Sequence, residues 1–245
     1  MPFASADGTA TPFMDALFTA TSATSLTGLV TVDTGSHWSI AGRVIVITLI
    51  QVGGLGIMSI ASLTGMLLTG RVKLRSRYST AAEGRPILEG GVRATLVATL
   101  LLTFAFELFV AVILFFRFMV EYDMPVLSAA GEGIFHAISA FNNAGFGLRS
   151  DSLISYNSDG WILLPLAGAL MIGGLGYPVL SELVGRSRER FRGLLRGTPV
   201  SARRLSVTTR ITLAGTTFLV LSAMALIAVL EWRGFLADMS TGCLL

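Results

Sequence analysis

Charged residues and cysteine are both scarce in this sequence. Asp, Glu, Lys and Arg make up 13% of its 245 residues, hydrophobic residues make up 53%, and the mean hydropathy is +0.73. A soluble domain has about 25% charged residues, so this composition predicts a membrane protein. The single cysteine, Cys243, excludes an intramolecular disulfide framework and a cysteine-rich metal site. Residues 1–12 lack the basic start and apolar core of a signal peptide, so we expect the membrane spans to drive insertion.

Residues of the kind that build enzyme active sites are also few. The two histidines, His37 and His136, have no metal-ligand spacing with other histidines or with the cysteine. Glu107 lies inside an apolar segment, where we favour a hydrogen bond between helices over a role in an ion path. We expect His136 to form a hydrogen bond behind residues 142–145. The sequence therefore predicts a protein that is not an enzyme and that holds no covalently bound cofactor.

Four apolar segments are predicted to cross the bilayer as helices, in residues 40–68, 94–118, 161–184 and 211–232. Pro178 is expected to kink the third of them. Two basic loops, 70–93 and 185–210, hold six and eight of the Lys and Arg residues, which is 14 of 18. Since Lys and Arg concentrate in short cytoplasmic loops, both are predicted to be cytoplasmic in a multi-pass protein of the cell membrane.

A repeated segment precedes two of these spans. Residues 18–28 align without a gap with residues 135–145 and share Phe, Ala, Ser, Ala and Gly. After each copy, the next span contains Gly-Gly-Leu-Gly, at 53–56 and at 173–176. We attribute these glycines to close helix packing rather than to a phosphate-binding loop, because they lie within a span. The chain therefore contains an internal repeat.

Each copy of the repeat is expected to begin with a short helix. In the first copy, Thr11 is the expected N-cap and Pro12 the first helical residue, after an exposed start, and the helix is expected to end near Ala23. The second helix is expected over 131–141. Neither reaches the about 20 residues that a span needs, and the non-helical residues that follow are tolerated at membrane depth only where protein encloses them or water reaches them. This order predicts two re-entrant pore loops.

The end of each copy suits a monovalent cation. Rings of backbone carbonyls replace the hydration shell of such an ion at little net cost. Glycine most easily adopts the backbone angles that this requires, and Gly28 and Gly145 occupy that place. The preceding helix points its negative dipole end toward the membrane centre, which favours a cation there. Side chains expected to brace the two segments by hydrogen bonds are those of Thr24, Ser25, Thr27, Asn142 and Asn143.

Three segments resemble the Trk/Ktr/HKT superfamily of potassium transporters, and within it the Ktr and Trk membrane subunits. They are Thr21-Ser-Ala-Thr-Ser-Leu-Thr-Gly-Leu29, Ile50-Gln-Val-Gly-Gly-Leu-Gly56 and Phe135-His-Ala-Ile-Ser-Ala-Phe-Asn-Asn-Ala-Gly-Phe146. The resemblance implies an all-helical, polytopic membrane protein built from units of outer helix, re-entrant pore loop and inner helix. It also implies a selectivity filter formed at Ser25, Leu26, Thr27, Gly28, Asn142, Asn143, Ala144 and Gly145. A glycine at position 28 resembles the potassium-selective members.

Matched to that pattern, the chain is expected to be incomplete at both ends. The first pore loop and inner helix are expected in residues 1–69, and the complete second unit in residues 94–184. The outer helix of the third unit, followed by a tail, is expected in residues 211–245. The loops 70–93 and 185–210 separate the three parts. Two of the four filter strands of the family are missing. We expect a fragment of a longer transporter, with two alternatives: two chains that each supply two pore loops, or a remnant that does not transport.

The resemblance also implies a substrate and partners. Potassium is the implied substrate, and sodium stays open as a coupling ion. The implied partners are the lipid bilayer, a second membrane subunit in a homodimer, and a cytosolic ring of nucleotide-binding regulatory subunits that would face the two basic loops. No nucleic-acid motif accompanies the arginines.

Overall fold

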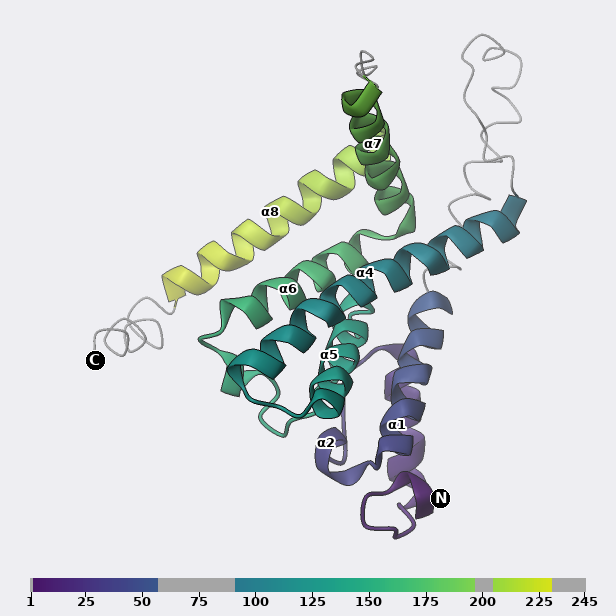
Figure 1. Cartoon of the computed structure of the whole chain (residues 1–245), viewed down its shortest axis with the longest axis vertical. Coiled ribbons are helices and arrows are strands. Elements are labelled where there is room, and N and C mark those ends of the chain that lie inside the picture. Colours follow the sequence, from purple (N-terminus) through teal and green to yellow (C-terminus); the bar gives the residue numbers. More distant parts are fainter. Residues whose placement is uncertain (1, 57–90, 197–204, 231–245) are drawn as a thin grey trace. The chain divides into compact units, whose positions relative to one another are not determined.

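The computed structural model describes residues 2–56, 91–196 and 205–230, and the regular elements in these ranges are helices (Figure 1). In chain order they are η1 (Pro2–Ala4), α1 (Phe13–Ser25), α2 (Thr34–His37), the helix Ile40–Gly56, α4 (Gly91–Glu121), α5 (Val126–Phe141), η2 (Ile154–Tyr156), α6 (Gly160–Leu175), α7 (Tyr177–Arg196) and α8 (Val207–Leu230). The only β pairing within the described residues is one isolated bridge between Ser5 and Trp38. This confirms the all-helical class.

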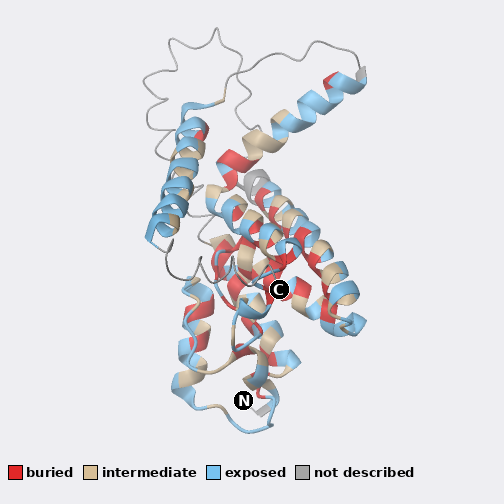
Figure 2. Cartoon of the chain, turned by 90° about the vertical axis from the view of Figure 1, so that its left-hand side faces the viewer, coloured by how far each residue is buried: buried red, intermediate tan, exposed pale blue. Residues whose placement is uncertain are grey.

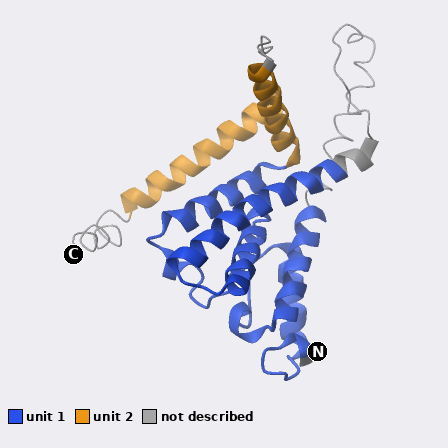
Figure 3. Ribbon diagram, viewed as in Figure 1, with its two compact units in different colours: residues 1–176 blue, residues 177–245 orange. Residues whose placement is uncertain are grey.

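The chain divides into two compact units, residues 1–176 and 177–245 (Figure 3). Among the described residues, the segments Val97–Glu121 and Val207–Leu230 are long and apolar enough to cross a membrane, and α6 with α7 would make a third crossing if they form one broken span. The expected span 40–68 is described only as far as Gly56, and the expected loop 70–93 lies outside the described residues except where α4 begins. Apolar side chains are exposed along these helices, as the pale blue in Figure 2 illustrates, which suits a lipid surround.

The core of the first unit is formed where α4, α5 and α6 pack on one another (Figure 1). Leu114 and Phe118 of α4, Phe141 of α5 and Ile162 of α6 are almost completely buried. Phe135 of α5 belongs to a second buried cluster, with Ala23 of α1 and with Val46 and Ile50 of the helix Ile40–Gly56. α5 begins at Val126, five residues earlier than expected. Pro125 directly precedes the helix. Because proline has no backbone N–H, it leaves no unbonded donor at the start of α5.

The N-terminal residues are mostly exposed, as expected, but their backbone is also hydrogen-bonded to a later part of the chain. The backbone N–H of Ala6 donates to the His37 carbonyl at 2.8 Å, and that of Ser39 donates to the Ala4 carbonyl at 2.9 Å. Thr11 is not the N-cap of α1, because its hydroxyl oxygen lies 3.0 Å from Nε2 of His37 and Pro12 precedes the helix. These contacts tie the start of the chain to the turn before the helix Ile40–Gly56.

The break in the third predicted span lies at Gly176 rather than at Pro178. Gly176 has φ 79° and ψ 156°, angles that a residue with a side chain rarely adopts, and α6 therefore ends at Leu175. Pro178 is the second residue of α7, where a missing N–H costs no helical hydrogen bond. Because α7 continues to Arg196, the arginines expected in a loop after residue 185 lie largely on a helix.

In the second unit, one carboxylate joins α7 to the start of α8. Glu182 of α7 accepts hydrogen bonds from the backbone N–H and the hydroxyl of Ser206, at 2.8 and 2.6 Å, and from the Thr209 hydroxyl at 2.5 Å. The Ser206 hydroxyl oxygen also accepts from the Thr209 N–H at 3.2 Å, so Ser206 caps α8. The two helices are thus joined by polar contacts at the point where the apolar helix α8 begins.

The carboxylate of Asp159 ties the end of α4 to the start of α6. It accepts a hydrogen bond from Nε of Arg117 at 2.7 Å, caps α6 through the N–H of Trp161 at 2.9 Å, and lies 3.3 Å from the Tyr122 hydroxyl. Burial would raise the pKa of Asp159, but the hydrogen bonds from Arg117 and Trp161 outweigh it, so the pKa lies below its ordinary value. The carboxylate is therefore more stable in the folded protein than in the unfolded chain.

We expect Asp159→Asn to lower the stability of the detergent-purified protein at pH 7 by about 1–3 kcal/mol, since charged hydrogen bonds are lost. Because the folded pKa is depressed, this contribution is fully present above the unfolded pKa of about 3.9 and is lost as the pH falls through the folded pKa. Thermal unfolding measured from pH 7 down to pH 3 tests this. A difference in unfolding temperature between Asp159→Asn and the unchanged protein that stays constant from pH 7 to pH 3 would contradict it.

Candidate functional site

The two copies of the repeat end in the same backbone conformation. We call residues 25–28 the first segment and residues 142–145 the second segment. Two residues before each final glycine the chain takes a left-handed conformation, with φ 58° at Leu26 and 57° at Asn143. The glycines themselves have φ 73° at Gly28 and 74° at Gly145. A repeat visible in the sequence is therefore also a repeat of local geometry.

Matching hydrogen bonds hold the two segments. The N–H of Thr27 donates to the Ser22 carbonyl at 3.1 Å, and at the equivalent place the N–H of Ala144 donates to the Ser139 carbonyl at 2.8 Å. The two serine side chains also brace the turns: Ser22 Oγ accepts from the Thr27 hydroxyl at 2.9 Å, and Ser139 Oγ donates to the Phe146 carbonyl at 2.7 Å. Sequence analysis missed this role of the serines, although both occupy a position that the two copies share.

The other expected braces differ from one another. The hydroxyls of Thr24 and Ser25 donate back into α1, to the carbonyls of Ala20 and Thr21. Asn143 makes a local contact of 3.4 Å to the Phe141 carbonyl. Thr27 also bonds locally, to Ser22, so Asn142 is the expected brace that connects a segment to groups far away in the sequence.

The two segments lie side by side at their glycines. A Cβ atom added to Gly28 would lie 2.6 Å from the Ala144 carbonyl oxygen and 3.2 Å from the Cα of Gly145. Between described residues, no hydrogen bond ends on the carbonyl oxygens of residues 25–28 or 142–145. Among the described residues, none of these eight carbonyl groups is engaged by a protein donor, although Asn142 and Ala144 are buried. Gly28, Ala144 and Gly145 are brought into direct proximity. Within the same described ranges there is no cluster of three His, Cys, Asp or Glu residues suited to a metal.

A buried polar cluster fixes the second segment from behind. Glu107 of α4 accepts from Asn142 Nδ2 at 2.9 Å through one oxygen and from Gln51 Nε2 at 3.1 Å through the other. Asn142 Nδ2 also lies 3.2 Å from the Gln51 side-chain oxygen, which closes a ring of three side chains. Glu107 and Asn142 are each only 3% exposed. The expected hydrogen bond of Glu107 between helices is confirmed, and it joins the first copy of the repeat to the second.

The glycines of the two Gly-Gly-Leu-Gly sequences allow the helices after each segment to approach the preceding short helices. A Cβ atom at Gly53 would overlap the Thr24 carbonyl oxygen, and one at Gly173 would overlap the Phe141 carbonyl oxygen. Thr24 and Phe141 are equivalent, since each precedes its segment's final glycine by four residues. Gly54 has the same function beside the Asn142 side chain. Gly53, Gly54 and Gly173 thus provide close packing, as expected, whereas Gly56 has no such neighbour among the described residues and Gly176 ends α6.

His136 lies on the side of α5 that supports the residues after the second segment. Its Nδ1 is 2.9 Å from the Glu132 carbonyl oxygen and 3.3 Å from a Glu132 carboxylate oxygen. The ring is 4% exposed, and a Cβ atom at Gly147 would lie 4.0 Å from its Nε2. Nε2 has no hydrogen-bond partner among the described residues, so the bond expected behind residues 142–145 stays a prediction.

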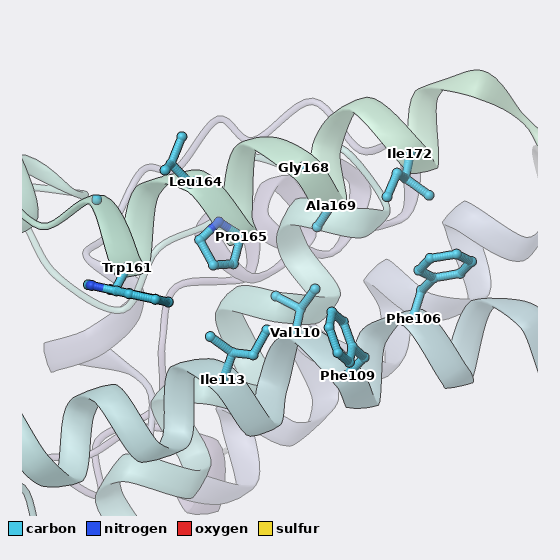
Figure 4. Close-up of a pocket in the computed structure, with 11 residues that line it drawn as sticks. Phe106, Phe109, Val110, Ile113, Trp161, Leu164, Pro165, Gly168, Ala169 and Ile172 are labelled. Atoms are coloured by element: carbon cyan, nitrogen blue, oxygen red, sulfur yellow. The ribbon is translucent and has the colours of Figure 1, made fainter.

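An apolar groove of about 590 Å³ lies between α4 and α6, and no residue of the two segments lines it (Figure 4). Phe106, Phe109 and Ile113 line one wall, and Trp161 and Leu164 line the other. A groove with so little polar lining cannot replace the hydration shell of an ion. It does not compete with the two segments as a cation site.

Known proteins resemble the chain along most of its length. The family model named TrkH and described as a cation transport protein matches residues 3–236. The chain is 37% identical over 221 residues to Ktr system potassium uptake protein B of Bacillus subtilis, with 90% of this chain and 46% of that protein covered. For the protein of the same name from Vibrio alginolyticus, identity is 39% over 182 residues, with 74% and 39% covered. For potassium/sodium uptake protein NtpJ of Enterococcus hirae, identity is 30% over 235 residues, with 96% and 49% covered. The chain thus spans less than half the length of each of these relatives.

We expect Gly53→Ala to destabilise the protein by about 1–3 kcal/mol, because the added methyl group forces the helix away from the carbonyl end of α1. Gly56→Ala is the matched control, since a Cβ atom there meets nothing within 4 Å. Thermal unfolding in detergent compares the two. Equal midpoints for both variants would show that the close approach at Gly53 does not contribute to stability.

We expect Glu107→Gln to lower stability by about 1–3 kcal/mol, because an NH₂ group then replaces an oxygen that accepts from a buried amide. The control is Glu121→Gln on the same helix, where the carboxylate pairs with Arg117 and is 53% exposed. That change should stay within about 0.5 kcal/mol. Thermal unfolding measures both, and a control that is as damaging as Glu107→Gln would refute the importance of the buried ring.

Proposed function

Since the chain belongs to the TrkH family of cation transport proteins, we propose that it contributes a pore-forming subunit for potassium uptake across the cell membrane. In this proposal the first and second segments are the filter strands of two repeated units. α1 and α5 are the re-entrant half-helices, and the helices that contain the Gly-Gly-Leu-Gly sequences are the inner helices. The family supports cation transport as such, and the geometry of the segments supports this assignment of roles.

The observation that carries the proposal is the shared geometry of the two segments. Two stretches 117 residues apart end in glycines with φ 73° and 74°, lie against each other, and leave their carbonyl oxygens without partners among the described residues. A permeating cation needs oxygens that are presented in this way, because it must lose water without being held too tightly. A purely structural turn would be expected to pair its carbonyls when buried.

The short helices add an electrostatic contribution. α1 has 13 residues and α5 has 16, so they extend about 20 and 24 Å at 1.5 Å per residue and fall short of a bilayer core of about 30 Å. α1 ends at the first residue of the first segment, Ser25, and α5 ends directly before the second segment. The partial negative charge of a helix C-terminus then lies close to the carbonyl oxygens and favours a cation. No metal cofactor is required for this role, because the ion is the substrate.

The names of the relatives support a choice of transported ion, and the number of segments in this chain indicates that further segments are needed. Two are named Ktr system potassium uptake proteins and one a potassium/sodium uptake protein, so we propose potassium as the substrate and leave sodium open as a second ion. Two segments cannot surround an ion by themselves. We propose that further segments come from the rest of a longer chain or from a second copy in a homodimer, and that a cytosolic nucleotide-binding ring regulates the pore from the side of residues 185–210.

We expect Gly28→Ala and Gly145→Ala each to reduce rubidium uptake at least about tenfold. This corresponds to an activation barrier for uptake that is higher by about 1.4 kcal/mol. The cells used lack their own potassium uptake systems. Alanine is strained at these positive φ values, and at Gly28 its Cβ would also displace the second segment. Gly131→Ala is the control, because a Cβ atom at that helical glycine meets nothing within 4 Å.

If the unchanged chain takes up rubidium, the two filter variants should reduce this uptake and the control should not. This result would support a working filter built by these 245 residues. Absence of uptake, with the protein shown to be inserted in the membrane, would favour a non-transporting fragment. The glycine variants would then be made in a full-length relative at the matching positions. Undiminished uptake by both of those variants would overturn the assignment of the filter.

A further inference from the structure

The second half of α7 contains a strip of exposed apolar residues. Phe191, Leu194 and Leu195 are 63%, 81% and 70% exposed. Residues three or four apart lie on the same face of a helix, so the side chains of Leu194 and Leu195 both neighbour that of Phe191. We call these three residues the α7 strip. Three large apolar groups that are side by side and uncovered on a soluble surface are unfavourable, so a partner for this strip is expected.

Arginines border the α7 strip on both sides. At about 100° per residue, Arg188 and Arg192 fall along one edge and Arg190 falls along the other. Arg186 lies farther around the helix on the side of Arg190 and pairs with Glu182 at 3.5 Å. Residues 185–195 contain these four arginines and a single acidic residue, Glu189, which lies on the opposite face. An apolar strip with basic margins is the pattern of a helix that lies in the surface of an anionic membrane.

The contacts of Glu182 place this part of α7 near a bilayer surface. Glu182 bonds to Ser206 and Thr209, where the apolar helix Val207–Leu230 begins. If α8 crosses the membrane, its first turn lies at the boundary between water and lipid, and Glu182 lies there too. Phe191 follows Glu182 by nine residues, which is about 14 Å along the helix. The α7 strip is therefore within a short distance of lipid headgroups.

We propose that the α7 strip docks on the cytoplasmic leaflet, with Phe191, Leu194 and Leu195 among the acyl chains and the bordering arginines on anionic headgroups. An acidic protein would match the arginines but would have to be recruited, whereas the leaflet is already present beside α8 and offers apolar and anionic layers in the right order. Docking would fix α7 in the membrane plane. This inference does not depend on ion transport.

The test follows the environment of a label at position 194. The chain with Cys243→Ser and Leu194→Cys is labelled with an environment-sensitive fluorophore and placed in nanodiscs of phosphatidylcholine alone or mixed with phosphatidylglycerol. We expect a blue-shifted emission that lipid-borne doxyl groups quench, mainly in the anionic discs, and a reversal at high salt because the attraction is screened. An emission typical of water in the anionic discs, or equal docking in both kinds of disc, would overturn the proposal.

A pair of matched variants isolates the charge. Arg188→Gln with Arg190→Gln should weaken docking about thirtyfold, which corresponds to about 1 kcal/mol for each arginine near an anionic surface. Arg188→Lys with Arg190→Lys keeps both charges and should dock like the unchanged protein. Circular dichroism confirms that both variants remain helical. If the lysine variant loses docking as the glutamine variant does, the arginines act through specific contacts and the lipid-surface proposal fails.

Discussion

A backbone carbonyl that leaves a helix at the depth of a bilayer must be enclosed by protein or face water, and under the function that we propose the first unit is arranged around this constraint. α1 and α5 end at Ser25 and Phe141, and the carbonyls of residues 25–28 and 142–145 at these ends accept no hydrogen bond from the described residues. Such an end would be unstable against lipid. It becomes tolerable when other helices pack closely around it, and useful when the open side faces a cation.

Close packing at these ends depends on residues without side chains. The helix Ile40–Gly56 reaches the Thr24 carbonyl at Gly53, and α6 reaches the Phe141 carbonyl at Gly173, so one solution is used twice. Glu107 then joins the helix that follows the first copy to the second copy, because its two oxygens accept from Gln51 of the helix Ile40–Gly56 and from Asn142. A carboxylate in an apolar span is costly unless it has partners, and here the partners belong to the supports of the candidate site.

The sequence predicted those features that are local or repeated. It predicted the helical class, the two short helices and the packing role of the glycines, because these follow from hydropathy, length and an internal alignment. It also predicted that Glu107 would bond between helices. It could not name Gln51 and Asn142, which are 56 and 35 residues away, since only the tertiary packing of three helices brings them together.

The errors of sequence analysis have one physical origin, the competition between neighbouring signals for a helix end. Thr11 and Pro12 have the pattern of a capped start, but His37 takes the Thr11 hydroxyl. Pro178 has the pattern of a kink, but Gly176 two residues earlier can adopt a positive φ that ends the helix, and Pro178 is then harmless in a first turn. Ending α6 at Leu175 makes α7 a helix of its own, and as a separate helix it presents one apolar face with basic margins. A single continuous span would have placed the same arginines in a loop, where no such face exists.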